Sequence, residues 1–232
     1  MKVFLDVLKP ALPIFYTFLI LALMHGAFRL YQIKSLKEQA GTKRVEGVAG
    51  NSLATEKMRI RKEARAKGLV GEEGVGALLE ELADEFGLVV LHDLSMPGTT
   101  ANIDHVLIQK QAVFVIDAKN YVGRVNIKKD SKGTPQLYVG GTKRTLLATK
   151  LKSYSQSIEK YLKAEGITVK IVPLLAFYKA SFHPDSKYEI GGVMVNVSGI
   201  KNESMRFAVK NRIEIDQEQV ADLILKEFPT KK

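Results

Sequence analysis

Two apolar segments joined by a very short connection constrain the fold more than any other feature of this sequence. They are IDHVLI (103–108) and AVFVIDAK (112–119). Short segments of β-branched residues are typical of strands, and so brief a connection predicts an antiparallel hairpin that turns at Lys110 and Gln111. The pairs that this register predicts are Gln109 with Ala112, Ile108 with Val113, and Val106 with Val115.

The same register brings charged side chains together towards one end of the hairpin. Asp104 lies opposite Asp117, and Lys119, two residues further along its strand, shares their face. Both faces are otherwise mainly apolar, which predicts strands covered on both sides. Two carboxylates in a partly dry site repel each other unless a proton, a cation or Lys119 compensates them. The pattern therefore indicates either a structural Asp–Lys–Asp group or a functional site.

A divalent metal ion would remove this repulsion economically. Mg²⁺ takes a few carboxylates and keeps water molecules that a substrate phosphate can displace. Such an ion activates water and stabilises the negative charge of a phosphodiester transition state. Lys119 could then hold or deprotonate the attacking water, or neutralise the scissile phosphate. We therefore expect Mg²⁺ or Mn²⁺ at Asp104 and Asp117.

The composition favours a polyanionic partner. The chain has 35 Lys and Arg against 25 Asp and Glu, a formal net charge of +10. This charge suits nucleic acid or anionic lipid headgroups, and a solvated basic surface explains it equally well. The absence of Cys excludes disulfides, thiolate zinc sites and a Cys nucleophile. The sequence has no G-x-x-x-x-G-K-[ST] loop and no recognisable base-reading module, which argues against ATP-driven activity and against sequence specificity.

Further periodic segments surround the hairpin. Gly68 and Gly71 are expected to open the first helix, Pro173 indicates a bulge or an edge strand, and Asp216 with Gln219 forms a capping box. Helices on both sides of a central mixed sheet, an α/β fold, are the expected architecture. The expected strands are 88–94, 121–127, 136–140, 168–177 and 191–197, and the expected helices are 71–87, 151–166 and 216–228.

The front of the chain has a different character. Residues 11–28 are mostly apolar, and a run of about 18 residues is at the lower edge of what spans a bilayer as a helix. A cleavable signal peptide is the rival interpretation, but no clear Ala-x-Ala site follows. Basic residues are more numerous after the run than before it. The positive-inside rule therefore predicts a single-pass membrane protein whose main domain is cytoplasmic.

Between the apolar run and the main domain, the sequence is basic and rich in glycine. GTKRVEGVAGNS (41–52) is expected to be a linker, and residues 53–68 a basic helix that is solvated or touches lipid phosphate or nucleic acid. The chain is thus divided into an N-terminal anchor (1–30), a basic linker and helix (31–67) and a main domain (68–232).

The motifs of the main domain together resemble the NERD domain, a nuclease-related domain. They are GLVGEEGV (68–75) before a helix, IDHVLI, VFVIDAKNYVGRV and a later helix, and they cover roughly residues 68–180. NERD domains are similar to the PD-(D/E)XK nuclease superfamily, which combines a restriction-endonuclease-like fold with a metal-bound acid, a second acid and a lysine. Such domains accompany membrane segments, kinases or helicases in various proteins.

The resemblance implies roles for five residues. Glu72 would be the acid of the leading helix, Asp104 and Asp117 the strand acids, Lys119 the catalytic lysine, and Gln156 the glutamine of the following helix. The metal would bind to Glu72, Asp104 and Asp117. The sequence departs from the family pattern in two ways: the second acid is usually Glu, and Asn-Pro often precedes the glutamine, where this chain has KSYS.

The function that the resemblance implies is a membrane-anchored, Mg²⁺- or Mn²⁺-dependent nuclease that hydrolyses phosphodiester bonds in DNA. Retention of Asp104, Asp117 and Lys119 favours this enzyme. Two alternatives remain open. One is a non-catalytic nucleic-acid-binding or membrane scaffold that keeps the nuclease fold, and the other is a metal-dependent phosphohydrolase of small substrates.

Overall fold

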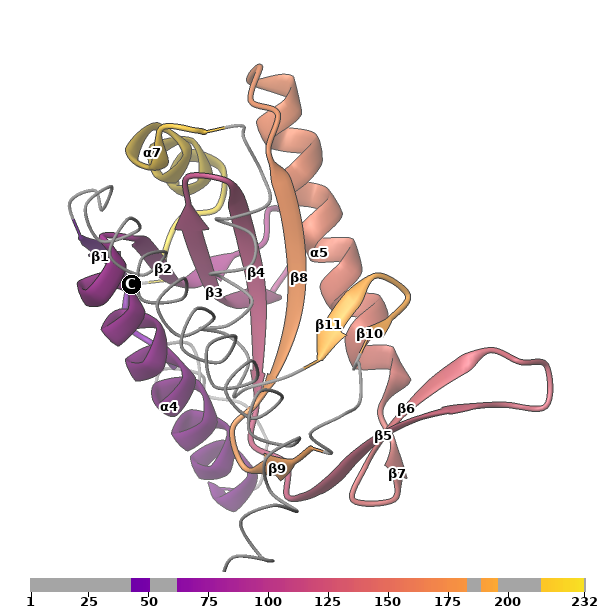
Figure 1. Cartoon of the computed structure of the whole chain (residues 1–232). Helices are drawn as coiled ribbons and strands as arrows, with labels where there is room; N and C mark the ends of the chain where they lie inside the picture. Colours follow the sequence, from indigo (N-terminus) through magenta and orange to yellow (C-terminus); the bar gives the residue numbers. More distant parts are fainter. Residues whose placement is uncertain (1–42, 51–61, 183–188, 196–213, 232) are drawn as a thin grey trace, which may run out of the picture. The chain divides into compact units, whose positions relative to one another are not determined.

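The main sheet has seven strands in the order β1-β2-β3-β4-β8-β11-β10 (Figure 1). It belongs to a computed structural model that describes residues 43–50, 62–182, 189–195 and 214–231. The β1–β2, β4–β8 and β8–β11 pairs are parallel, and the others are antiparallel, so the sheet is mixed as predicted. The strands are β1 (Arg44–Glu46), β2 (Val89–Ser95), β3 (Asn102–Gln109), β4 (Ala112–Lys119), β8 (Lys170–Phe177), β10 (Glu189–Ile190) and β11 (Val193–Val195).

The predicted hairpin is confirmed at the centre of this sheet. β3 and β4 pair Gln109 with Ala112, and the register continues as predicted as far as His105 opposite Ile116. Almost every residue of β2, β3 and β4 is buried. Central strands that are covered on both faces have this pattern, because apolar side chains then face a packed layer on either side.

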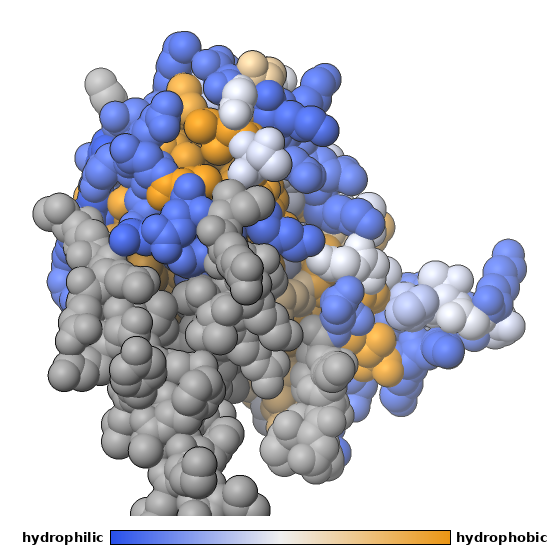
Figure 2. Space-filling view, turned by 45° about the horizontal axis from the view of Figure 1, so that its top comes forward, coloured by the Kyte–Doolittle hydropathy of each residue, from blue (hydrophilic) through white to orange (hydrophobic). Residues whose placement is uncertain are grey.

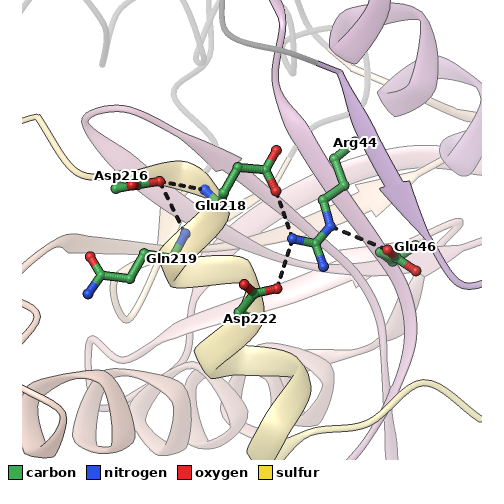
Figure 3. Close-up of polar contacts among 6 residues, drawn as sticks. All are labelled: Arg44, Glu46, Asp216, Glu218, Gln219 and Asp222. Atoms are coloured by element: carbon green, nitrogen blue, oxygen red, sulfur yellow. Dashed lines mark hydrogen bonds and ion pairs between the residues drawn. The ribbon is translucent and has the colours of Figure 1, made fainter.

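Helices cover both faces of the main sheet, which confirms the predicted architecture (Figure 1). α4 (Lys62–Phe86) packs on β2, β3 and β4. α5 (Thr145–Ala164) and α7 (Gln217–Glu227) lie on the other face, where their side chains join one core with alternate residues of β3 and β4. The carboxylate of Asp216 accepts hydrogen bonds from the backbone N–H groups of Glu218 and Gln219 (Figure 3), so its predicted role as the N-cap of α7 is confirmed.

The glycines of α4 serve close packing inside the helix. A Cβ added at Gly71 would lie 2.8 Å from the Cβ of Asn120, and one at Gly76 would lie 2.7 Å from the Cβ of Ala49. The predicted helix start at Gly68 and Gly71 is wrong, because α4 begins at Lys62 and continues through both glycines. Glycine is usually a helix breaker, which is the basis of the prediction. The first part of the predicted basic helix, residues 53–61, lies outside the described residues.

Part of the predicted linker is an edge strand of the sheet. β1 pairs in parallel with β2 through Arg44–Val89, Val45–Val90 and Glu46–Leu91. A strand of three residues is too short to show a periodic pattern, and charges hold it in place. The guanidinium of Arg44 lies 2.7 Å from a carboxylate oxygen of Glu218, 2.9 Å from Asp222 and 3.3 Å from Glu46 (Figure 3).

Replacement of Arg44 by Ala should weaken the attachment of β1 to α7. The three carboxylates are partly exposed, so we expect unfolding to require only about 1 kcal/mol less free energy. Hydrogen exchange at residues 44–46 should become markedly faster. The matched control is Lys43→Ala, which removes a more exposed pair with Asp84 and should change neither quantity measurably. Unchanged exchange in Arg44→Ala would contradict this role.

A second sheet of four strands, in the order β7-β6-β5-β9, continues from the end of β4. The predicted meander is confirmed as β5 (Gly123–Lys129) and β6 (Pro135–Val139), and it lies outside the central sheet. The other two strands are β7 (Thr142–Lys143) and β9 (Ala180–Ser181). The β5–β6 hairpin extends away from the main sheet (Figure 1).

The predicted edge position of Pro173 is wrong. Pro173 lies within β8, opposite Val115 of β4, and β11 runs along the other side of β8. Among the described residues, however, β11 pairs only with Leu174 and Leu175. A proline has no N–H to donate, so it is tolerated where one side of its strand has no partner.

The described part of the chain contains no helix long and apolar enough to cross a membrane. The predicted anchor, residues 11–28, lies outside the described residues. Membrane anchoring and orientation therefore stay predictions.

Candidate functional site

The two central strands stop pairing where the predicted acids begin. The β3–β4 ladder ends at His105 and Ile116, one residue before Asp104 and Asp117. Beyond this point a carboxylate oxygen of Asp104 accepts the backbone N–H of Ala118 at 2.8 Å. Asp104 itself is only 5 % exposed. The side chain of Asp104 thus replaces a backbone acceptor, which fixes its position at the end of the hairpin.

Lys119 joins the two aspartates. Its ammonium donates to a carboxylate oxygen of Asp117 at 2.7 Å and to the carbonyl of Ala118 at 2.8 Å, and it lies 3.5 Å from Asp104. Burial opposes the charge of Lys119, but the negative charges of Asp104 and Asp117 outweigh it and raise the pKa of the lysine. In this arrangement Lys119 is a stable cation, and it acts through its charge and its hydrogen bonds.

Glu72 approaches the same cluster from α4. It is 7 % exposed, and its Oε2 is buried without a hydrogen-bond partner in the described structure. Burial and the charge of Asp104 raise the pKa of Glu72 to about 9, against the opposing effect of Lys119. Burial also raises the pKa of Asp104 to about 7, although Lys119 and the N–H of Ala118 favour its ionised form. The cluster therefore holds more carboxyl groups than Lys119 can neutralise.

Gln156 makes no described contact with this cluster. It is exposed on α5, whose buried residues around it are Leu151, Ser155 and Ile158. No hydrogen bond in the described structure connects Gln156 to Asp104, Asp117 or Lys119. The structure thus brings together four of the five predicted site residues, and the role of Gln156 stays a prediction.

Asp93 is a further acid of the site that sequence reasoning missed. It is 1 % exposed and has a φ of 55°, rare for a residue other than glycine. Asn102 donates to Asp93 at 2.9 Å and reaches Asp104 at 3.5 Å, and Asp93 contributes to the raised pKa of Glu72. The sequence does contain a sign of this role, since Asp93, like Asp117, is a charged residue within an apolar strand.

Two buried histidines lie beside the acids on the α4 face of the sheet. The Nδ1 atoms of His92 and His105 are 2.8 Å apart, so one ring donates a hydrogen bond to the other. The Nε2 of His92 lies 3.3 Å from a carboxylate oxygen of Glu80. Burial lowers the pKa of both histidines, which favours a neutral pair. The two rings thus form a hydrogen-bonded polar pair beside Gly76 of α4.

The donor chemistry of the cluster fits a hard divalent cation. Asp104, Asp117 and Glu72 supply the carboxylate oxygens that Mg²⁺ prefers, and the buried Oε2 of Glu72 lacks a partner. Within the described ranges, however, no three acidic or histidine side chains are close enough to hold a metal ion as they stand. Lys119 is the cation that contacts the aspartates in this arrangement, so a metal would compete with it.

Comparison with known families gives one match. Residues 67–178 match the family model NERD, described as a nuclease-related domain. This range contains all five predicted site residues as well as Asp93 and Asn102. No curated protein and no solved structure matches the chain.

Proposed function

From the nuclease-related domain that residues 67–178 form, we propose that the chain is a metal-dependent nuclease that hydrolyses phosphodiester bonds in DNA. The observation that carries this proposal is the contact of Lys119 with Asp117 and with the buried Asp104, at the end of the two central strands. The raised pKa values of the buried Glu72 and Asp104 support it, because active sites use burial and neighbouring like charges to shift the pKa values of their acids and bases.

The acidic residues and the lysine of the cluster would have different roles in catalysis. Asp104, Asp117 and Glu72 would hold Mg²⁺ or Mn²⁺, which supplies an activated water and neutralises charge on the phosphate. Lys119 keeps its proton, so it orients the water through its N–H groups or faces the negative phosphate. Asn102 holds Asp93 and Asp104 at fixed positions. Gln156 keeps the role that the family resemblance implies.

A non-catalytic scaffold that binds nucleic acid is the second candidate, and one observation favours it. Lys119 contacts both aspartates, as a purely structural Asp–Lys–Asp cluster would require. A protein of this kind would keep the fold and bind nucleic acid without cleaving it.

The test uses the full chain with linear duplex, circular duplex and single-stranded DNA, and with RNA. We expect cleavage of DNA in Mg²⁺ or Mn²⁺ and none after addition of EDTA. A bis-aryl phosphodiester that carries no nucleotide separates a nuclease from a phosphohydrolase of small substrates, because only the latter would prefer it. Binding of DNA without cleavage of any substrate would favour the scaffold.

We further propose that residues 11–28 anchor the chain in a membrane with the main domain in the cytoplasm, on the strength of the apolar run and the basic residues after it. A reporter that is active only in the cytoplasm, fused after Lys232, should be active. If this reporter is inactive, and a second reporter that works only outside the cytoplasm is active at the same position, the proposed orientation is wrong.

A further inference from the structure

The second sheet has one strongly basic face. Alternation along β5, and its register with β6 and β7, place six side chains on the same side of this sheet. We call this side the basic face. Its cations are exposed, Asn126 and Tyr138 are half-buried, and Gln136 is buried. The members of the basic face are Arg124, Asn126 and Lys128 of β5, Gln136 and Tyr138 of β6 and Lys143 of β7.

The opposite side of the same sheet is fixed in the protein core. Val125 and Leu137 are fully buried and Val139 nearly so, and they pack with the residues of α5. Because one side is packed in this way, the basic face is held on a rigid support. Such a support preserves the spacing of its charges, which lowers the entropic cost of binding a partner.

The charges of the basic face are largely uncompensated within the described structure. Neither Arg124 nor Lys128 forms a salt bridge there. The nearby Asp130 uses its carboxylate to accept the N–H groups of Lys132 and Thr134 and the side-chain amide of Gln136, which closes the hairpin turn. These hydrogen bonds, with some help from Lys143, lower the pKa of Asp130. Exposed cations on a supported face suit a polyanion.

The basic face begins close to the acid–lysine cluster. Only residues 120–122 separate Lys119 at the end of β4 from the start of β5. The guanidinium of Arg144 lies 4.5 Å from the ring centroid of Tyr121, which holds this connection at the base of the hairpin. The hairpin leaves the main sheet at the end where β4 finishes (Figure 1), and the colours of the projecting part range from hydrophilic to intermediate (Figure 2).

We propose that the basic face binds the sugar–phosphate backbone of nucleic acid beside the bond that the cluster acts on. The inference rests on the proposed function for its substrate. Arg124 and Lys128, four residues apart on one strand, are separated by about 14 Å, which corresponds to the rise of about four base pairs along the axis of a duplex. Asn126 and Tyr138 lie between the cations and can donate hydrogen bonds to phosphate oxygens. Backbone contacts of this kind do not depend on base sequence.

The test is duplex binding by the full chain in EDTA, where no cleavage interferes. The variant that removes the cations of the basic face, called the arm variant, carries Arg124→Gln, Lys128→Gln and Lys143→Gln together. We expect its affinity for a labelled 30-base-pair duplex to fall on the order of 10- to 100-fold at 100 mM salt, and the slope of log K against log salt to fall by about 2 to 3. The matched control variant is Lys160→Gln, Lys163→Gln and Lys170→Gln. It removes the same charge from exposed positions at the other end of α5 and β8, and should bind within about 3-fold of the wild type.

The outcomes separate this proposal from the nuclease proposal. Equal losses in the arm and control variants, or no loss in either, would overturn the role of the basic face. So would an arm variant that loses binding to vesicles of anionic lipid and keeps its binding to the duplex. Selective loss of duplex binding supports the basic face even if the wild type never cleaves DNA. If the arm variant fails to fold by circular dichroism, Lys128→Gln alone tests the same point through a salt slope lower by about 1.

Discussion

Replacement of Lys119 by Met should lower metal-dependent cleavage of duplex DNA by about 100-fold or more. Met keeps the apolar stem and removes the ammonium that contacts Asp117 at 2.7 Å and faces Asp104 at 3.5 Å. Duplex binding should change little, because 34 of the 35 Lys and Arg residues remain to attract phosphate. The measurements are turnover of a labelled duplex in Mg²⁺ and affinity in EDTA.

The same variant should also be less stable at neutral pH, because two carboxylates lose their cation. We expect a loss on the order of 2 kcal/mol, limited by the ability of Asp104 to take up a proton. The double variant Asp117→Asn, Lys119→Met should regain stability without regaining cleavage. Equal turnover by the wild type, Lys119→Met and the double variant would point to a contaminating nuclease, and would remove Lys119 from the catalytic site.

The sequence predicts the centre of the fold well for a physical reason. A two-residue turn fixes which residues of the hairpin are opposite as far as His105 and Ile116. The predicted pair of Asp104 with Asp117 lies just beyond this ladder, where Lys119 contacts both carboxylates. The convergence of these three groups needs only that local register. Glu72, in contrast, was assigned from the family resemblance, because its approach depends on how α4 packs over the sheet.

Other features depend on contacts between distant segments, which periodicity does not reveal. β1 has three residues and is held by Arg44 through carboxylates of α7, more than 170 positions away. The glycines of α4 resemble a helix start until Asn120 and Ala49 are seen to pack against them. Asp93 has its place in the site through a positive φ and through Asn102 on the neighbouring strand.

The metal-free protein should become less stable as the pH rises from about 7 to about 9. In the folded chain the pKa of Asp104 is about 7 and that of Glu72 about 9, whereas both groups titrate near pH 4 when unfolded. Rising pH therefore favours unfolding through both carboxyl groups. The lowered pKa values of His92 and His105 have the opposite effect only below about pH 6.5, where the unfolded state binds more protons on these two groups. The contribution of Asp104 is lost through about pH 7 and that of Glu72 through about pH 9. Lys119 stays protonated in both states over this window and does not alter the trend.

Glu72→Gln tests the source of this dependence. The amide cannot ionise, so the variant should gain stability at pH 8–9, on the order of 2 kcal/mol relative to the wild type, and should show a flatter profile. Asp84→Asn, at an exposed carboxylate of the same helix, should leave the profile unchanged.

Mg²⁺ should stabilise the wild type most at pH 8–9, because it binds the ionised carboxylates of the folded state, and should stabilise Glu72→Gln less. Urea unfolding at each pH gives these free energies. A wild-type stability that rises between pH 7 and 9 without metal would show that the buried carboxyl groups are compensated in the folded chain, and the electrostatic case for a metal site would fail with it.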